Sequence, residues 1–184
     1  MRLDPDGLER VEPPADLRLV PVGEDDADDC SRLAATIFGD SYDDERAFVE
    51  AVLRDEAREL FMAHGADGAV GMATITRGEA GYELNGVGVL PEHRGKGIGR
   101  RLVAATAKWL SERGTQSLVI WVLKENLKGR AFYEALGGQL VGEQTITIGG
   151  SSLQDVAYGW PDLSTILHAP RDAGGDSHEA AAIR

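Results

Sequence analysis

The chain has 184 residues, 42% of them hydrophobic and 27% charged, which is the balance of a single globular domain. Its formal net charge of −12 excludes the basic surface that nucleic-acid binding requires, so we expect no nucleic-acid partner. The single cysteine, Cys30, excludes an internal disulfide and a cysteine-based metal cluster. No apolar run approaches the roughly 20 residues that cross a bilayer, and the N-terminus carries no signal-peptide pattern. We therefore expect a cytoplasmic protein without a membrane partner.

The N-terminal third of the sequence predicts a leader, a strand and two helices. Residues 1–16 contain several prolines and no apolar period, which predicts a flexible leader. A domain is predicted over residues 17–161, and its first element is the alternating strand Leu17–Val22. An acidic stretch then leads into a helix that ends at Gly39, and a second helix is predicted from Asp43 to Ala57.

The rest of the domain alternates strands and helices. Three strands separated by glycine-containing turns are predicted at Glu59–His64, Ala69–Thr76 and Tyr82–Val89. An amphipathic helix follows at Ile98–Arg113, and a strand at Ser117–Leu123. A short helix is predicted at Asn126–Leu136, and a closing hairpin is formed by Gln139–Ile148 and Leu153–Trp160. The pattern fades over residues 162–184, which we expect to form a disordered tail. This order predicts an α/β (α+β) fold with a mixed, mostly antiparallel sheet of about seven strands and helices on both faces.

A glycine-rich loop stands between the third strand of the meander and the amphipathic helix. Its sequence is Arg94-Gly95-Lys96-Gly97-Ile98-Gly99, and Pro91 turns the chain into it. Glycines let a backbone approach a ligand closely, and the first-turn amides of a helix form a site for anions. Arg94 and Lys96 add positive charge in an otherwise acidic chain. The segment therefore predicts a phosphate-binding loop.

Two familiar phosphate loops do not fit this spacing. A Walker-type loop needs Ser or Thr after its Gly-Lys pair, and here Gly97 follows Lys96. The dinucleotide fingerprint has a different glycine spacing. The pattern Arg-x-x-Gly-x-Gly after a strand that ends in Val-x-Pro instead resembles the central cofactor motif of the GNAT acetyltransferases.

A second segment strengthens the resemblance. Trp121–Gly138 contains a strand, an Asn that opens a helix, a Phe-Tyr pair and a glycine stop, and it resembles the second motif of the same family. The similarity extends over roughly Leu17–Trp160. It implies the GNAT fold and acetyl-CoA as cosubstrate. His64, His168 and His178 share no ligand-like spacing, so we expect no metal.

The resemblance also implies where acetyl-CoA binds. The strand that carries Val87 and Val89 is expected to splay from the strand that carries Trp121, and the amides of Val87 and Val89 are expected to bind pantetheine and the acetyl carbonyl. The cofactor-binding residues are then Val87, Val89, Arg94, Gly95, Lys96, Gly97, Ile98, Gly99 and Asn126. Asn126 is also suited to cap its helix, and the two roles are compatible. Gly86 and Gly88 fit a bulged or closely approached strand, or a simple bend.

Two side chains are candidates for proton transfer. Tyr133 occupies the position of the family's usual general acid for the leaving thiolate, although it could equally pack beside Phe132. Glu83 occupies the position of a general base in some members, with Tyr82 and Asn85 as neighbours that could arrange a water. A solvated glutamate on a strand remains the alternative.

The implied reaction is direct transfer of an acetyl group to a primary amine, most simply on a small molecule, and the negative charge could attract such a cation. Acetylation of a protein N-terminus or lysine, and a non-catalytic acyl-CoA-binding module, are the alternatives. The resemblance also implies a possible homodimer.

Overall fold

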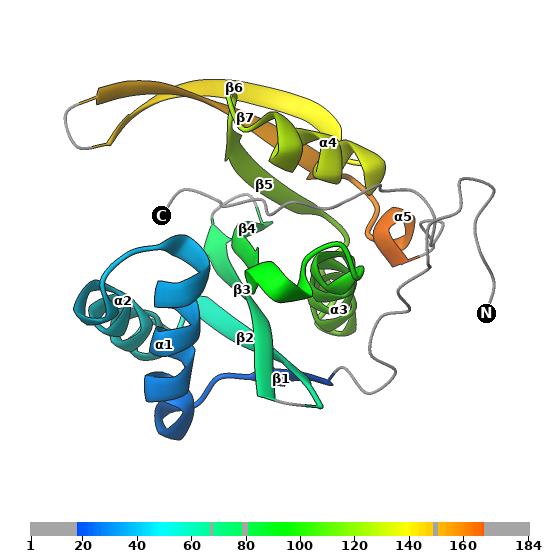
Figure 1. The fold of residues 1–184 in the computed structure, drawn as a ribbon. Helices are drawn as coiled ribbons and strands as arrows, with labels where there is room; N and C mark the ends of the chain where they lie inside the picture. Colours follow the sequence, from blue (N-terminus) through cyan, green and yellow to red (C-terminus); the bar gives the residue numbers. More distant parts are fainter. Residues whose placement is uncertain (1–17, 67, 79–80, 149–150, 168–184) are drawn as a thin grey trace, which may run out of the picture.

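A computed structural model describes residues 18–66, 68–78, 81–148 and 151–167 (Figure 1). Seven strands form one sheet in the order β1-β2-β3-β4-β5-β7-β6. Only the β4–β5 pair is parallel, so the mixed and mostly antiparallel sheet predicted from sequence is confirmed. The strands are β1 Arg18–Pro21, β2 Arg58–Gly65, β3 Gly68–Gly78, β4 Gly81–Val89, β5 Leu118–Leu123, β6 Gln139–Ile148 and β7 Ser151–Trp160.

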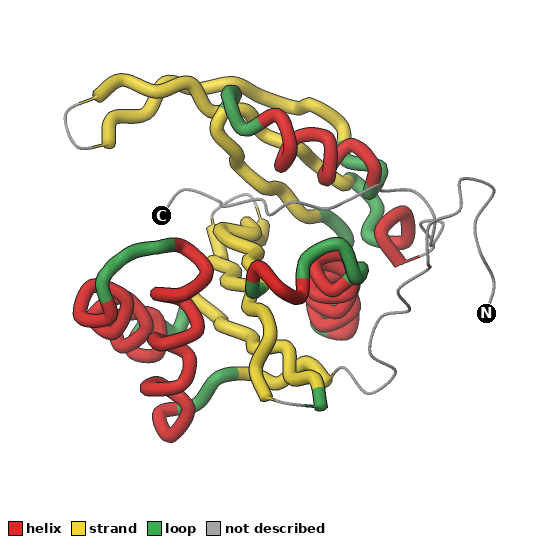
Figure 2. The backbone as a smooth tube through the Cα atoms, in the orientation of Figure 1, coloured by secondary structure: helices red, strands yellow, loops and turns green. Residues whose placement is uncertain are grey.

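Helices cover both faces of this sheet. The α-helices are α1 Ala27–Phe38, α2 Tyr42–Arg54, α3 Ile98–Glu112, α4 Leu127–Ala135 and α5 Ser164–Leu167, and two 3-10 turns, η1 Glu24–Asp26 and η2 Pro91–His93, precede α1 and α3. One buried cluster joins α1 and α2 to β2 and β3, and a second joins α3, α4 and α5 to the opposite face. The hairpin of β6 and β7 extends beyond the helices (Figure 2).

The amphipathic pattern correctly predicted the central helix. Ile98, Leu102, Val103, Thr106 and Leu110 of α3 are buried against the sheet. Burial of such a face contributes more to the stability of a helix in a protein than its intrinsic propensity does. This packing fixes the N-terminus of α3 beside the end of β4, which positions the glycine-rich loop.

Two predicted boundaries were wrong. The second helix ends at Arg54 instead of Ala57, because the Asp55 side chain accepts a hydrogen bond from the Ala57 amide and turns the chain into β2. Residues 162–167 are not a disordered tail, since α5 packs its buried Ile166 into the core with Leu163. The predicted leader, residue 17, parts of three predicted turns and residues 168–184 lie outside the described residues. No helix within the described part of the chain is long and apolar enough to span a membrane.

Candidate active site

Strands β4 and β5 part midway along their length (Figure 1). They pair over only three residues, Tyr82–Leu84 opposite Leu118–Ile120. Strand β4 nevertheless continues to Val89 and β5 to Leu123. From Asn85 onward, the side of β4 that faced β5 has no strand partner in the described sheet. An unpaired backbone edge of this kind can bind an extended ligand as an added strand.

A β-bulge marks the point where the strands part. Thr74 of β3 pairs with Gly86 and the next residue, Ile75, pairs with Leu84, so Asn85 is the extra residue on β4. The Thr76 hydroxyl donates a hydrogen bond to Asn85 Oδ1 and holds the bulge. In a regular strand, residues an odd number of positions apart point to opposite faces. The inserted Asn85 reverses this alternation, so that Leu84 lies on the same α3-side face as Val87 and Val89. The bulge therefore places Val87 and Val89 in the same buried cluster as Leu84.

Gly86 and Gly88 of β4 meet different surroundings on the α1 side of the sheet. A Cβ on Gly88 would lie 2.4 Å from Ile37 Cγ2, so this position is held to glycine by packing against α1. A Cβ on Gly86 would have no heavy atom within 4 Å and would enter open space. Of the two, Gly86 is the position where an approaching molecule would find room.

This contrast predicts that alanine lowers the free energy of unfolding at position 88 but hardly changes it at position 86. Gly88→Ala should lower the free energy of unfolding by about 1–3 kcal/mol, because an overpacked position forces α1 away from the sheet. Gly86→Ala should change it by less than about 0.5 kcal/mol. Urea denaturation of the two variants and the parent protein measures both. Equal destabilisation by the two substitutions would contradict the open surroundings assigned to Gly86.

The glycine-rich loop has the geometry of an anion site. Gly95 and Gly97 have φ values of 73° and 72°, in the left-handed region that disfavours other residues. The backbone N–H groups of residues 95–99 make no hydrogen bond to another described backbone group. They precede or begin the 15-residue helix α3, at the positive end of its dipole. The loop therefore presents a row of amides to a negatively charged group.

The two cationic residues of the loop differ in their surroundings. Arg94 Nε donates a hydrogen bond of 3.0 Å to the carbonyl oxygen of Val89 and so ties the loop to the end of β4. Lys96 is half-buried between the two left-handed glycines. Arg94 therefore has a structural role in addition to its charge, which the motif alone did not predict.

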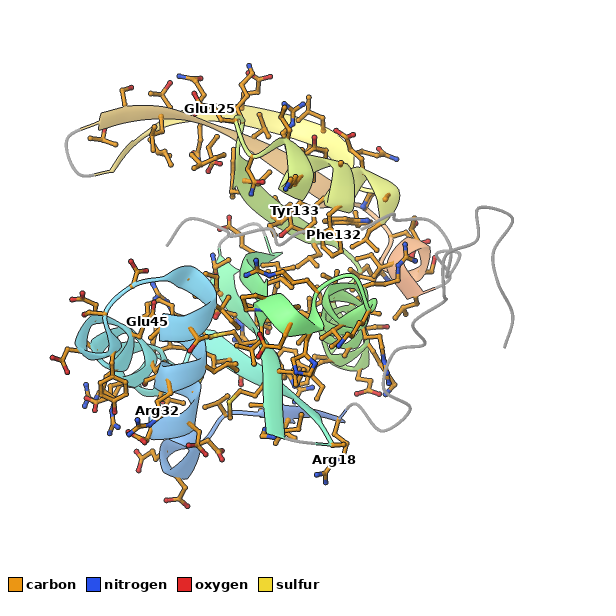
Figure 3. The ribbon with its side chains drawn as sticks, in the orientation of Figure 1. Arg18, Arg32, Glu45, Glu125, Phe132 and Tyr133 are labelled. Atoms are coloured by element: carbon orange, nitrogen blue, oxygen red, sulfur yellow. The ribbon has the colours of Figure 1, made fainter. Side chains whose placement is uncertain are left out.

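Tyr133 lies at the centre of the buried layer between α4 and the sheet. Its side chain is fully buried, and its hydroxyl has no hydrogen-bond partner among the described residues. Burial raises the pKa of this phenol above its ordinary value, because the phenolate would be desolvated. Its ring contacts those of Phe132, Tyr158 and Trp160, with centroids 5.2, 6.3 and 6.2 Å away (Figure 3). An orphaned buried hydroxyl is costly, which suggests a partner that binds from outside the chain.

Phe132 connects this tyrosine to the glycine-rich loop. A Cβ on Gly99, in the first turn of α3, would lie 3.5 Å from the Phe132 ring and 3.9 Å from Val89 Cγ2. The start of α3, the end of β4 and α4 thus meet at one point. The sequence-predicted residues Gly99 and Val89 meet there at Phe132, which was not predicted to join them, and Tyr133 follows through its ring contact with Phe132.

Asn126 caps α4. Its Oδ1 accepts a hydrogen bond of 2.9 Å from the Gly129 amide, which satisfies one of the free N–H groups of the helix. A Cβ on Gly129 would lie 2.7 Å from Asn126 Nδ2, so glycine is needed for the cap. The structure shows the capping role of Asn126, and its binding of the cosubstrate stays a prediction.

Glu83 lies on the α1-side face of the sheet. It pairs with Thr76 of β3 and Val119 of β5, immediately before the bulge. It is half-exposed and therefore open to solvent. Tyr82 points the other way, toward Trp109 at a centroid distance of 6.2 Å, so the suggestion that Tyr82 helps Glu83 to arrange a water was wrong. Strand alternation places successive side chains on opposite faces.

One buried acid near this site was not predicted. Asp155 of β7 is only 3% exposed, and it stands directly before the apolar end of the strand, Val156–Trp160. A carboxyl group inside a strand pattern is an available sequence signal. Its burial, however, depends on neighbours in β5 and β6, which the sequence does not place.

The comparison with known proteins agrees with this geometry. Residues 25–138 match the model of the Acetyltransferase (GNAT) family, which covers more than half of the chain. An uncharacterised N-acetyltransferase of Bacillus subtilis, YuaI, is 35% identical over 113 residues, which are 58% of this chain and 65% of that protein. A mycothiol acetyltransferase of Kocuria rhizophila is 32% identical over 54% of this chain and 32% of its own length. The chain thus spans between about a third and two thirds of these curated relatives.

Solved structures of low sequence identity share the fold. An N-acetyltransferase from Staphylococcus aureus Mu50 has a TM-score of 0.69 at 18% identity and is covered over 99% of its length by 82% of this chain. The spermidine/spermine N-acetyltransferase SpeG of Vibrio cholerae has a TM-score of 0.64 at 20% identity, with 82% of this chain and 95% of that chain covered. With the parted strands, the glycine-rich loop and the family match in agreement, this chain belongs to the GNAT acetyltransferase family.

Proposed function

We propose that this chain is an acetyl-CoA-dependent N-acetyltransferase that transfers the acetyl group directly to a primary amine of a small molecule. The observation that carries the proposal is the fully buried, unpartnered hydroxyl of Tyr133, whose ring packs on Tyr158, the β7 partner of Ile120 in the last β4–β5 pair. A group so placed can donate a proton to an atom that enters between the two strands. The family match and the amide-lined loop support the same reaction.

The residues present fit acetyl-CoA. The amides of residues 95–99 would bind the pyrophosphate at the N-terminus of α3, with Lys96 adding charge. The unpaired edge of β4 at Val87–Val89 would bind the pantetheine arm as an added strand and direct an amide at the acetyl carbonyl. When bound, acetyl-CoA supplies an activated acetyl group as a thioester.

Tyr133 and Glu83 divide the proton transfers. Glu83 accepts a proton from the incoming ammonium through water, so that a neutral amine attacks the carbonyl carbon. A C–N bond forms and the C–S bond breaks, the Tyr133 hydroxyl donates its proton to the departing sulfur, and the extra proton on the attacking nitrogen returns through water to the Tyr133 oxygen. Most of the acceleration comes from holding the amine and the thioester in the right geometry.

The burial of Tyr133 suits this role. Its raised pKa keeps the phenol protonated throughout the neutral range, so the proton is always available. The departing thiolate forms in the same desolvated layer, where burial raises the pKa of a thiol as well. Because desolvation disfavours both the Tyr133 phenolate and the thiolate, transfer of the proton from the phenol to the sulfur remains accessible.

Glu83→Gln should lower kcat/KM about tenfold at neutral pH, because the amine must then lose its proton without help. The deficit should shrink as the pH rises, because more of the amine arrives uncharged. Thiol release measured across pH values tests this, with the Kd for acetyl-CoA as the control that should not change. A deficit that is constant with pH would contradict the role of Glu83 as base.

The proposed function is tested by thiol release from acetyl-CoA with a panel of small amines and of peptides with free N-termini or lysines. Acetylation of small amines supports the proposal, whereas acetylation of peptides alone favours the protein-modifying alternative. Binding of acetyl-CoA without turnover favours a non-catalytic acyl-CoA-binding module. A homodimer and a cytoplasmic location stay predictions.

A further inference from the structure

The α1-side face of the sheet can be followed across four strands. Strand register carries it from Met72 on β3 to Glu83 on β4 and Val119 on β5, and then along β7 to Ala157 and Asp155. The opposite face of β7 carries the residues that pack with Tyr133 of α4. Asp155 is therefore on the same side of the sheet as Glu83 and the open space at Gly86.

Asp155 is a buried acid with an incomplete set of partners. Its carboxyl accepts hydrogen bonds from the Gln144 side chain and the Val156 backbone. Its Oδ1 has no partner among the described residues. Burial raises the pKa of this carboxyl, because desolvation disfavours its charged form.

Within the described part of the chain, no cation on the same face offsets the charge of an ionised Asp155. The cross-strand neighbours of Asp155 are Leu123 and Gln144, and none of the described residues that flank it on this face is Lys or Arg. Lys124 is close in sequence, but it lies on the alternate face and pairs with Glu143 at 2.9 Å. A buried carboxylate that lacks both a cation and a full set of donors is best stabilised by a cation from outside the chain.

The surroundings of Asp155 suit an alkylammonium group. Trp121 of β5 is a diagonal neighbour, since it pairs with Ala157, and such neighbours are about 8 Å apart between Cα atoms. The Trp121 ring extends over β6, where its edge would lie 3.5 Å from a Cβ on Gly142. An aromatic face beside a carboxylate is a favourable environment for an ammonium and its methylenes. The group that covers the carboxyl, Gln144, is exposed, so its amide can be displaced.

The spacing sets the size of the acceptor. Across the sheet, Glu83 is in line with Val119 of β5 and Gly159 of β7, two strands away. Asp155 lies on β7 four residues from Gly159. Strand geometry makes the Cα–Cα distance about 16 Å. Since both side chains stand on the same face, an aliphatic chain that carries an amine at each end can span the separation between the two carboxylates.

We infer that Asp155, with Trp121 beside it, binds a second ammonium group of the acceptor, so that the preferred substrates are aliphatic diamines or polyamines. This inference rests on the proposed function, because it names the acceptor of that same site. Glu83 serves the amine that is acetylated, and Asp155 anchors the distant one. The exposed Gln144 amide occupies Asp155 until the ammonium replaces it.

The test compares α,ω-diaminoalkanes of increasing length with monoamines of the same carbon count. The parent protein should favour the diamine in kcat/KM by about 10–100-fold at the best length, the range of one charge-assisted hydrogen bond. Asp155→Asn keeps the shape and should abolish that preference through KM, with kcat little changed. Glu143→Gln is the matched control, since it removes one negative charge from the other face of the hairpin and should keep the preference.

Two further measurements keep the inference separate from the proposed function. Calorimetric binding of the diamine in the absence of acetyl-CoA should be weakened about tenfold or more by Asp155→Asn, whether or not the protein turns over. Gln144→Ala should lower the KM for diamines, because the competing amide is gone. Equal diamine binding by the parent and Asp155→Asn, or loss of the preference in Glu143→Gln as well, would overturn the role of Asp155. Absence of turnover with Asp155-dependent diamine binding would overturn the proposed function alone.

Discussion

Tyr133→Phe should lower kcat by about 10²–10³-fold and leave the Kd for acetyl-CoA unchanged. The substitution removes only the hydroxyl that would protonate the departing sulfur. The same change should leave the free energy of unfolding unchanged or raise it, because the hydroxyl is buried without a partner. Thiol release at saturating substrates measures kcat, and urea denaturation measures stability.

Tyr158→Phe is the matched control for this experiment. Its ring lies 6.3 Å from that of Tyr133, but its hydroxyl donates to Glu134 and accepts from Arg130 Nε at 3.1 Å. Removing a satisfied hydroxyl should cost about 1–2 kcal/mol of stability and little activity. If Tyr133→Phe loses stability and keeps its kcat, the tyrosine is only a packing residue.

Gly97→Ala should weaken acetyl-CoA binding by about 10–100-fold. The substituted residue resists the left-handed conformation at φ 72°, so the amides of residues 95–99 would no longer point in one direction. The same strain should cost about 1–2 kcal/mol of stability. A Cβ there meets no heavy atom within 4 Å, so steric clash does not complicate the result.

The opposite end of the same helix supplies the control. Gly114 follows α3, has a φ of 80° and would also place its Cβ in open space. Gly114→Ala should therefore lose similar stability but bind acetyl-CoA as the parent does. Titration calorimetry and urea denaturation of both variants give the comparison. Similar Kd values for the two variants would show that the loop is not the pyrophosphate site.

The sequence predicted the fold well where each element carries its own pattern. The helical period of Ile98–Arg113 and the alternation of Gln139–Ile148 depend on neighbouring residues alone, and both elements were found close to the predicted positions. The left-handed Gly95 and Gly97 were expected because only glycine adopts such dihedrals without strain.

The features that the sequence did not predict depend on residues distant in the chain. The glycines of β4 indicated a bulged or closely approached strand, but the place of the bulge at Asn85 depends on pairing with β3, and α5 is ordered because Ile166 reaches the core beside α3. The burial of Asp155 depends on both neighbouring strands. Within the candidate site, the motif predicted which residues gather and that Asn126 caps its helix, but the orphaned hydroxyl of Tyr133 and the hydrogen bond from Arg94 to Val89 required atomic contacts.

The short ladder between β4 and β5 also affects how long the protein survives. It divides the domain into two halves, β1–β4 and β5–β7, whose backbones are joined across the sheet by three residue pairs only. The boundary between the two halves, here called the seam, would be closed by a ligand that binds between them. At a concentration of 100 times its Kd, such a ligand adds about 2.7 kcal/mol to the free energy of unfolding. Opening of the seam, and proteolysis through it, would then decrease as acetyl-CoA accumulates. The cosubstrate would thus set the lifetime of the protein as well as its turnover rate.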